Sequence, residues 1–269
     1  MESARSLFDL SDRRVLITGA SRGIGLCLAR GFAAAGAQVA MAARSAETLR
    51  EEAAAIRGEG GWATAVPGDL STGDGCTGVV EDAVTALGGG LDVVLHNAGG
   101  PIVDEDGVLL MRTVLGASDT EWAGVLDVNL MATVWLLRAA RPFLSVSPDP
   151  SVTVMSSVAG LVGIGGMEPY GAAKAAQVSL VRSLGTAWAR QGIRVNALCP
   201  GWVRTEMTSS AHEDESTSEA VLSHVPQRRW AEPGELVGPA IFLSSPAASF
   251  MTGQTLVVDG GLVAHPLIG

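Results

Sequence analysis

Short, almost continuously apolar runs alternate with longer stretches of helical periodicity along most of this 269-residue chain. A run that is apolar at nearly every position is typical of a strand whose two faces are both covered by helices. Strands and helices in this alternation predict a parallel, doubly wound α/β sheet with right-handed crossovers. We expect strands at Val15–Thr18, Gln38–Ala43, Trp62–Val66, Leu91–His96, Ser151–Ser156, Ile193–Leu198 and Thr255–Val258.

Helices are expected between these strands, at Ile24–Ala35, Glu47–Arg57, Gly75–Leu87, Thr120–Phe143, Pro169–Gln191 and Pro233–Leu243. Pro142 and its neighbours are expected to end the fourth of them. The segments Gly100–Asp119 and Thr205–Arg229 have neither periodicity and are expected to be irregular. Long segments of this kind in a compact domain are usually functional, so we expect residues 205–229 to form a substrate lid. No linker divides the chain, and we expect a single domain over residues 1–269, with residues 1–10 as an N-terminal tail.

Composition and charge exclude several classes of partner. The chain has 28 acidic and 18 basic side chains, a net charge of −10, which argues against nucleic acid or an anionic membrane. Cys27, Cys76 and Cys199 are far apart and lack metal-ligand spacing, so we expect reduced packing residues and no metal. The chain has no signal-peptide pattern and no uncharged apolar stretch long enough to span a membrane. We therefore expect a cytoplasmic protein with no membrane partner.

A glycine-rich turn follows the first expected strand and opens the first expected helix. Gly19, Gly23 and Gly25 would let the backbone turn tightly and approach a pyrophosphate, to which the helix N-terminus would offer free N–H groups. A turn of this kind between a strand and a helix predicts a dinucleotide site. Ser21, Arg22 and Ile24, in the same turn, are also expected to contact the cofactor.

The end of the second expected strand indicates which dinucleotide binds. Enzymes that use NAD typically place Asp or Glu there to hold the adenosine ribose hydroxyls, but this strand ends Met41-Ala42-Ala43-Arg44. Arg44 could pair with a ribose 2′-phosphate, and Arg22 adds a second positive charge nearby. We therefore expect NADP(H) rather than NAD(H). The alternative is that both arginines are ordinary surface residues.

The chain has one tyrosine and one lysine, and they lie four residues apart, at Tyr170 and Lys174. On a helix this spacing places both side chains on one face. An ammonium beside a phenol favours the phenolate and lowers the phenol pKa from its usual value of about 10. The pair is a candidate general acid/base. The alternative is an exposed helix that carries two amphipathic side chains by chance.

Together with Asn97-Ala98-Gly99 after the fourth strand, these motifs resemble those of the short-chain dehydrogenase/reductase family. Further matching pieces, in the order usual for the family, are Asp69-Leu70, Asn129, Ser157, Pro200-Gly201 through Thr205, and Val258-Asp259-Gly260-Gly261. Ser157 lies 13 residues before Tyr170, the separation usual in the family, and is therefore preferred to Ser156. The resemblance implies a seven-stranded parallel sheet flanked by helices, which agrees with the strands expected above.

The resemblance also implies a role for each matching residue. Tyr170 would give a proton to a carbonyl oxygen while hydride passes between nicotinamide and the carbonyl carbon, and Ser157 would hydrogen-bond that oxygen. Lys174 would lower the Tyr170 pKa and bond the nicotinamide ribose, and Asn129 would hold a water that connects Lys174 to solvent. The other cofactor contacts would be Asp69 and Leu70 at the adenine, Asn97, Ala98 and Gly99 at the adenosine ribose, and Pro200, Gly201, Val203 and Thr205 after the sixth strand.

Several of these residues also have a purely structural interpretation. Asn129 could distort its helix, Ser157 could end a strand, Asp69 could form a turn, and Pro200-Gly201 could break a loop. The consistent order of the motifs argues against all of these being correct together. His96 departs from the pattern, since the family usually has Asn at this place.

The expected activity is NADP(H)-dependent oxidoreduction of a small-molecule ketone or secondary alcohol by a homo-oligomer, a tetramer or a dimer. The three-residue gap between Tyr170 and Lys174 argues against C=C reduction, since related enoyl reductases use a wider one. Substrate is expected to lie against Val158–Met167, Trp202–Met207 and the loop after Gly99. The alternatives are a non-catalytic NADP(H)-binding sensor on the same fold and an NAD-dependent polyol or sugar-acid dehydrogenase.

Overall fold

A computed structural model of the chain describes residues 6–105 and 107–264. Within these residues, seven strands form one sheet in the order β3-β2-β1-β4-β5-β6-β7, and every pair of neighbours is parallel. The strands are β1 (Arg14–Thr18), β2 (Gln38–Ala43), β3 (Trp62–Pro67), β4 (Val93–His96), β5 (Ser151–Met155), β6 (Arg194–Pro200) and β7 (Thr255–Val258). The predicted doubly wound sheet is confirmed.

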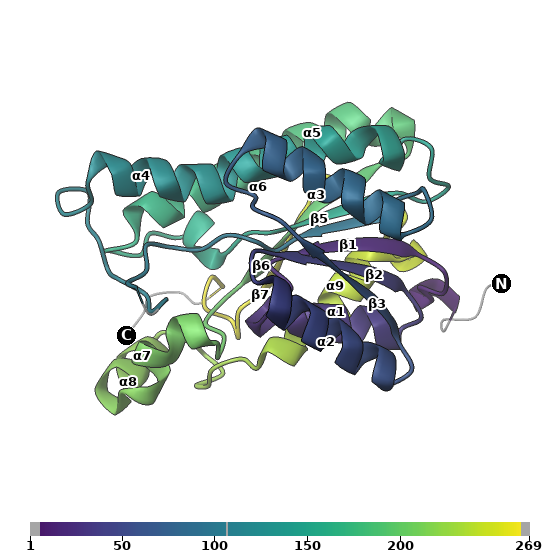
Figure 1. Cartoon of the computed structure of the whole chain (residues 1–269). Coiled ribbons are helices and arrows are strands. Elements are labelled where there is room, and N and C mark those ends of the chain that lie inside the picture. Colours follow the sequence, from purple (N-terminus) through teal and green to yellow (C-terminus); the bar gives the residue numbers. More distant parts are fainter. Residues whose placement is uncertain (1–5, 106, 265–269) are drawn as a thin grey trace.

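Helices cover both faces of the sheet (Figure 1). One layer holds α3 (Gly73–Ala86), α5 (Ala132–Leu144) and α6 (Glu168–Trp188), with α4 (Asp119–Leu126) continuing it at one end. The opposite layer holds α1 (Gly23–Ala34), α2 (Ala46–Gly58) and α9 (Val237–Ser244). The buried apolar residues accordingly form two clusters, one between each layer and the sheet. This is why β4 and β5 are buried at every position and are not alternately polar.

The expected helix Thr120–Phe143 is continuous, but its middle is wound differently. Residues Asp127–Met131 form a π-helical turn between α4 and α5, and such turns often mark functional positions. Pro142 lies inside the last turn of α5, which ends at Leu144, one residue beyond the expected end at Phe143. Among the described residues, Asp119–Leu144 is long and apolar enough to cross a membrane by length and composition alone. In the fold, its α5 part packs on α3.

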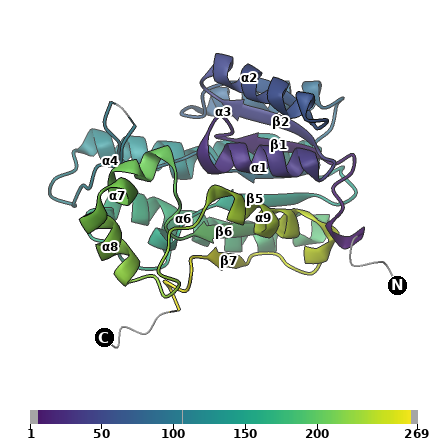
Figure 2. The ribbon, with the colours of Figure 1, turned by 90° about the horizontal axis from the view of Figure 1, so that it is seen from below.

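The segment 205–229 is not irregular, which corrects the sequence-based expectation. It contains α7 (Ser209–Glu213) and α8 (Glu215–Ser223), which lie together beyond one end of the sheet (Figure 2). Asp214 caps α8 by accepting a hydrogen bond from the Thr217 N–H at 2.8 Å. Because α8 has no buried residue, its sequence carries too weak an apolar stripe to be recognised as helical.

Of the expected N-terminal tail, residues 1–5 lie outside the described residues. Residues Ser6–Phe8 form a short 3₁₀ turn, and the Phe8 ring lies 6.4 Å from that of Phe242 in α9. Leu10 is fully buried in the core cluster beneath α1. The packed part of the chain therefore begins before β1.

Candidate active site

The sequence-predicted site residues gather along the carboxyl edge of the sheet. Each expected cofactor-binding group outside the helices comes directly after a strand: Gly19 after β1, Arg44 after β2, Asp69 after β3, Asn97 after β4 and Gly201 after β6. The strand order reverses between β1 and β4. Ligands of open α/β sheets bind in the crevice at such a reversal.

The turn between β1 and α1 is shaped to hold an anion. Gly19 and Gly23 have positive φ angles of 65° and 55°, which side chains with a Cβ rarely adopt. A Cβ on Gly25 would lie 2.1 Å from the Gly19 carbonyl oxygen, so only glycine fits there. Among the described residues, the N–H groups of Gly23, Ile24 and Gly25 have no hydrogen-bond partner, and α1 has no side-chain cap. These open donors and the helix dipole fit a pyrophosphate.

A buried polar network joins this turn to the end of β4. The Asn97 amide Nδ2 donates to the Gly19 carbonyl at 3.2 Å, and the N–H groups of Asn97 and Ala98 donate to Thr18 Oγ1 at 3.1 and 3.0 Å. Because Thr18 Oγ1 accepts both bonds, its own proton goes to His96 Nδ1, which lies 2.9 Å away. His96 thus anchors the Thr18 hydroxyl, and burial lowers the His96 pKa to about 3.

Gly99 brings Asn129 and Lys174 close together. A Cβ on Gly99 would lie 2.5 Å from Asn129 Oδ1 and 3.4 Å from Lys174 Nζ. The Asn129 side chain, fully buried in the π-helical turn, donates to the carbonyls of Gly100 and Val125 at 2.8 Å each and accepts from the Gly100 N–H at 3.1 Å. Both of its N–H groups are thus occupied by backbone. The side chain fixes the loop after Gly99.

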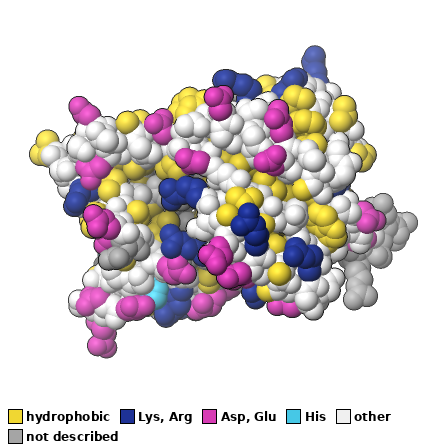
Figure 3. All heavy atoms as spheres, in the orientation of Figure 1, with side chains coloured by type: hydrophobic (Ala, Val, Ile, Leu, Met, Phe, Trp, Pro, Cys, Tyr) yellow, Lys and Arg dark blue, Asp and Glu magenta, His cyan; other side chains and the backbone are white. Residues whose placement is uncertain are grey.

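The two arginines expected to contact the cofactor, Arg22 and Arg44, follow β1 and β2 at the carboxyl edge of the sheet. Basic and acidic side chains are interspersed on the face of the molecule drawn in Figure 3. Arg44 is exposed and, among the described residues, forms no hydrogen bond or ion pair. The Asp69 pKa is lowered mainly by the hydrogen bonds from Ser71 and, to a smaller extent, by the charge of Arg44. The Asp69 carboxylate accepts bonds from the N–H and hydroxyl of Ser71 at 3.0 and 2.7 Å, so it also forms the turn that the sequence allowed. Arg22 pairs with Glu206 at 2.8 Å, and both side chains are more than half exposed.

The residues after β6 divide into structural positions and one that faces the glycine turn. Gly201 packs on β7, since a Cβ there would lie 2.8 Å from the Asp259 Cα, and its N–H bonds to the Val258 carbonyl at 2.9 Å. Val203 is buried beside Ala231, and Pro200 ends β6. Leu70, which was expected at the adenine together with Asp69, likewise has a structural position, because it lies in the core. Thr205, by contrast, approaches Gly23, whose Cβ position lies 3.6 Å from the threonine methyl.

The hydroxyls of Ser156 and Ser157 point to different partners. Ser156 is buried and donates to the Lys174 carbonyl at 3.0 Å, which ties β5 to α6. Ser157 lies close enough to the Tyr170 hydroxyl to lower the phenol pKa, and it accepts a bond from the Ala159 N–H at 3.1 Å. Only Ser157 therefore lies beside the phenol. The turn that carries it approaches α6 closely because Gly160 has no Cβ, which would stand 2.7 Å from the Lys174 backbone.

Lys174 lies under Tyr170, with Nζ 5.4 Å from the ring centroid, and donates to the Met155 carbonyl at 2.9 Å. Burial lowers the Lys174 pKa to about 7. Burial also raises the Tyr170 pKa to about 12, although the hydrogen bond with Ser157 opposes that rise. The expected lowering of the phenol pKa is therefore wrong. The loss of water outweighs the attraction of an ammonium that is only partly charged near neutrality.

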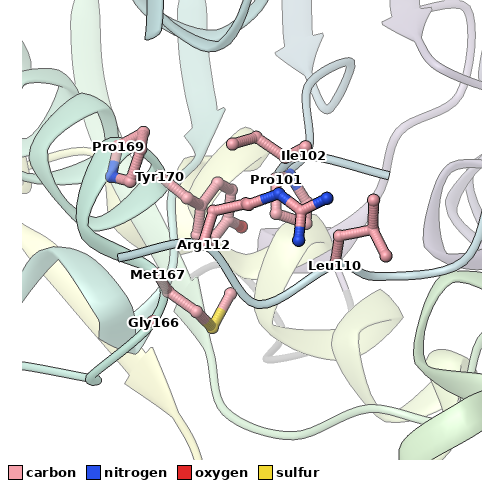
Figure 4. Close-up of a pocket in the computed structure, with 8 residues that line it drawn as sticks. All are labelled: Pro101, Ile102, Leu110, Arg112, Gly166, Met167, Pro169 and Tyr170. Atoms are coloured by element: carbon pink, nitrogen blue, oxygen red, sulfur yellow. The ribbon is translucent and has the colours of Figure 1, made fainter. Parts of the chain in front are cut away.

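A small pocket opens in front of Tyr170 (Figure 4). Its lining comprises Pro101, Ile102, Leu110, Arg112, Gly166, Met167, Pro169 and Tyr170. Two of the three expected substrate walls, the loop after Gly99 and the segment ending at Met167, thus line it. The third approaches it, because the Leu109 N–H donates to the Met207 carbonyl at 3.3 Å.

Sequence reasoning missed Arg112, Gly160 and the partnership of Thr18 with His96. Arg112 carries no sequence signal because it belongs to a loop without periodicity. Gly160 is one of 34 glycines in the chain. The histidine at position 96 was noticed as a departure, and the matching polar residue at the end of β1 was the signal that could have identified its partner.

Comparisons with known proteins agree with this geometry. A family model described as enoyl-(acyl carrier protein) reductase matches residues 19–263. The gluconate 5-dehydrogenase of Gluconobacter oxydans is 35% identical over 260 residues, which are 95% of this chain and 96% of that protein. A gluconate 5-dehydrogenase from Burkholderia cenocepacia, solved in complex with NADP and tartrate, is 32% identical with a TM-score of 0.91, covering 98% of this chain and all of that one. A short-chain type dehydrogenase/reductase from Mycobacterium marinum is 33% identical with a TM-score of 0.87, over 97% and 99% of the two chains.

Proposed function

Because the chain belongs to the short-chain dehydrogenase/reductase family, we propose that it transfers hydride between NADP(H) and a ketone or secondary alcohol, with Tyr170 as general acid/base. The observation that carries this proposal is the placement of Tyr170, which lies beside Ser157, has Lys174 under its ring, and lines a pocket. The family description names an enoyl reductase. The three-residue gap between tyrosine and lysine and the names of the dehydrogenase relatives favour C=O over C=C chemistry.

The chemistry divides between cofactor and protein. The nicotinamide supplies or accepts the hydride. In reduction, Tyr170 releases its proton to the carbonyl oxygen while Ser157 donates a hydrogen bond to that oxygen. Lys174 then stabilises the phenolate that remains, which matters because burial makes that anion costly. In oxidation, the phenolate removes the alcohol proton.

The cofactor would lie along the carboxyl edge of the sheet. The open N–H groups of Gly23, Ile24 and Gly25 would bind the pyrophosphate, and Thr205 faces it from the opposite side. Ser21, Ala98 and Gly99 line the same edge. NADP(H) is the cofactor supported: an NADP-bound relative has this fold, and β2 is followed by Arg44 with no carboxylate. Arg22 is the second cation that could reach the 2′-phosphate.

Asn129 is proposed to act through its position. Its side chain holds Gly100, and its backbone carbonyl accepts bonds from Thr133 Oγ1 at 2.6 Å and Gln177 Nε2 at 3.0 Å. A water that connects Lys174 to solvent would therefore have to bind beside this crowded group.

The single-domain organisation, the lid role of residues 205–229 and a homo-oligomeric state are also proposals. Light scattering in solution tests the last of these.

The test is turnover with a panel of ketones and secondary alcohols, gluconate included, with each nicotinamide cofactor, followed by absorbance of the reduced form. We expect NADPH to be consumed with a ketone, and Tyr170→Phe to remove that activity by at least about 10²-fold. Tight NADP(H) binding without turnover of any substrate would instead identify a sensor. Turnover with NAD(H) alone would identify the NAD-dependent polyol or sugar-acid dehydrogenase.

Cofactor choice is tested separately with Arg44→Ala. Because Arg44 forms no hydrogen bond or ion pair with any described residue, its removal should raise KM for NADPH by about tenfold and leave KM for NADH almost unchanged. Equal effects on the two cofactors would refute the assignment.

A further inference from the structure

Arg112 lies in the pocket that opens onto Tyr170, and it is the one charged side chain among the eight residues that line this pocket. Its guanidinium extends across the pocket past Tyr170 and lies near Pro101 and Leu110 (Figure 4). Most of the other lining residues are apolar. The Arg112 side chain is 38% exposed, so water partly screens its charge, but an anion that enters this pocket meets no other charged side chain in its lining.

The backbone fixes Arg112 relative to the catalytic helix. The Arg112 N–H donates to the Gly166 carbonyl at 2.6 Å, and Arg112 pairs with Met167 as in a parallel sheet. Met167 directly precedes α6, which carries Tyr170. The backbone from which the Arg112 side chain extends is thus fixed against the same helix that carries the phenol.

The guanidinium is only weakly engaged by the protein. Arg112 Nε lies 3.4 Å from Glu121 Oε1, a long contact for an ion pair, and its terminal nitrogens form no hydrogen bond with any described residue. The other Glu121 oxygen, Oε2, already accepts bonds from the N–H and hydroxyl of Ser118 at 2.7 and 2.9 Å. Glu168, the nearest carboxylate in sequence to Tyr170, lines a neighbouring pocket that does not include Arg112. The forked face of Arg112 is therefore available to a ligand.

We infer that Arg112 binds a carboxylate of the substrate, so that the substrates of this site are keto acids and the corresponding hydroxy acids. The inference rests on the proposed function, because it assigns the substrate of the Tyr170 site. One end of such a molecule places its C=O or CH–OH group at Tyr170 and Ser157. Its carboxylate pairs with the terminal nitrogens of Arg112, a geometry that an arginine fork matches with two parallel bonds.

Binding is tested with pairs that differ only in the carboxylate: gluconate against glucitol, and 4-oxopentanoate and 5-oxohexanoate against their primary amides. Gluconate and glucitol are titrated calorimetrically into the chain loaded with NADPH, with which neither alcohol can react; the keto compounds are titrated with NADP⁺ bound, for the same reason. At least one acid should bind about tenfold or more tightly than its neutral partner. If no acid binds more tightly than its neutral partner, the inference is wrong.

Four variants test whether Arg112 causes the difference in affinity between the acids and their neutral partners. Arg112→Met should reduce the acid-to-neutral affinity ratio by about tenfold or more, and Arg112→Lys should restore part of it, since the charge returns without the fork. Glu121→Gln keeps a residue type that completes the helix cap and releases Arg112 from its weak contact, so the ratio should rise. Arg138→Met, an exposed arginine on α5, is the matched control and should leave the ratio unchanged. Thermal midpoints of all variants report on folding, and an unchanged ratio in folded Arg112→Met would overturn the inference.

Kinetics separate this inference from the proposed function. If the wild type consumes NADPH with keto acids and their amides, and Arg112→Met lowers kcat/KM only for the acids, both stand. If Arg112→Met lowers kcat/KM equally for acids and amides, the oxidoreductase function stands and the carboxylate assignment falls. If no ketone supports turnover while the acid-to-neutral binding difference persists and depends on Arg112, the carboxylate site stands and the oxidoreductase function falls.

Discussion

Lys174 lies beneath the Tyr170 ring with its ammonium bonded to the Met155 carbonyl. Because both groups are buried, the charge of one depends on the protonation of the other. The chain has no other lysine or tyrosine that could substitute. The acid/base behaviour of the site is therefore set by how little water surrounds these two side chains.

A pH dependence follows from the Lys174 pKa of about 7. Below that pH the side chain is charged and can stabilise the phenolate left when Tyr170 gives up its proton, and above it the charge is lost. We expect kcat/KM for NADPH in ketone reduction, which reports on groups of the free enzyme, to fall as the pH rises through about 7. Lys174→Met should be much less active and lack this step. A wild-type profile that is flat across neutral pH would contradict the prediction.

Ser156 and Ser157 provide a matched pair in adjacent positions. Ser157→Ala should lower kcat by about 10²-fold or more, since it removes the donor to the reacting oxygen, and should cost about 1 kcal/mol of stability through the lost bond from the Ala159 N–H. Ser156→Ala removes a buried bond to the Lys174 carbonyl and should cost about 1 kcal/mol of stability with a small effect on kcat. Urea unfolding and steady-state kinetics on both variants check this. The reverse pattern would move the catalytic role to Ser156.

At the scale of elements, the crevice is bounded by the glycine turn and by the segment that follows β6. Arg22 and Glu206 join these two segments at 2.8 Å, and the Trp202 and Trp230 rings, 5.6 Å apart, pack the base of the same segment. Trp230 in turn donates to Ser218 of α8 at 2.8 Å. Helix α8 is therefore attached to the rest of the fold through Trp230. The turn that precedes α7 is attached to the glycine turn through one exposed ion pair.

The ion pair predicts a competition between Glu206 and the cofactor. Arg22 must leave or share Glu206 to bind a 2′-phosphate, so Glu206→Gln should lower KM for NADPH and leave KM for NADH unchanged. Because both side chains are more than half exposed, the change should be no more than about fivefold and should disappear at high salt. Steady-state kinetics with both cofactors at low and high salt checks this. A rise in KM for NADPH would show that Glu206 helps to position Arg22.

The sequence predicted most elements because their signals are local. Continuous apolar runs located every strand to within two residues at each end, and the glycine turn located the crevice. The sequence did not predict α8, which has no buried residue. It also did not predict the π-helical turn at Asn129, which depends on bonds to Gly100 across the fold. Arg112 and the Tyr170 pKa also depend on packing between segments far apart in sequence. Their spacing identifies Tyr170 and Lys174 as a pair, but it does not show how far the two side chains are buried from water, on which their pKa values depend.

At the scale of the whole molecule, charged networks hold the amino edge of the sheet, opposite the site. Asp92, just before β4, accepts three bonds from Arg14 of β1 at 2.8 to 3.0 Å and one from Ser147 at 2.7 Å. Asp149 similarly pairs with Arg13 at 2.9 Å and lies 3.7 Å from Arg194 of β6. These contacts join the strands on both sides of the reversal in strand order that forms the crevice. Stability at this edge can therefore be changed without touching the chemistry.

Asp92 provides a test of that separation. Although burial alone would raise it, the hydrogen bonds from Arg14 and Ser147 hold the Asp92 pKa at about 2, below its ordinary value of 3.8. A carboxyl whose folded-state pKa is lowered stabilises the fold above the unfolded pKa, and this stabilisation is lost as the pH falls from about 4 to about 2. The shift corresponds to about 2 kcal/mol, which is reasonable for a side chain only 7% exposed.

Asp92→Asn should therefore lower the free energy of unfolding by about 2 kcal/mol near neutral pH. The difference from wild type should shrink toward zero as the pH falls to about 2, because the wild type then loses the same stabilisation. Urea unfolding of both proteins over this range measures the difference, with Asp82→Asn, an exposed aspartate on α3, as the control. At neutral pH and moderate temperature, the folded variant should keep the wild-type kcat. A difference in stability that stays constant with pH would mean that the lost packing of Asp92, and not its charge, holds this edge together.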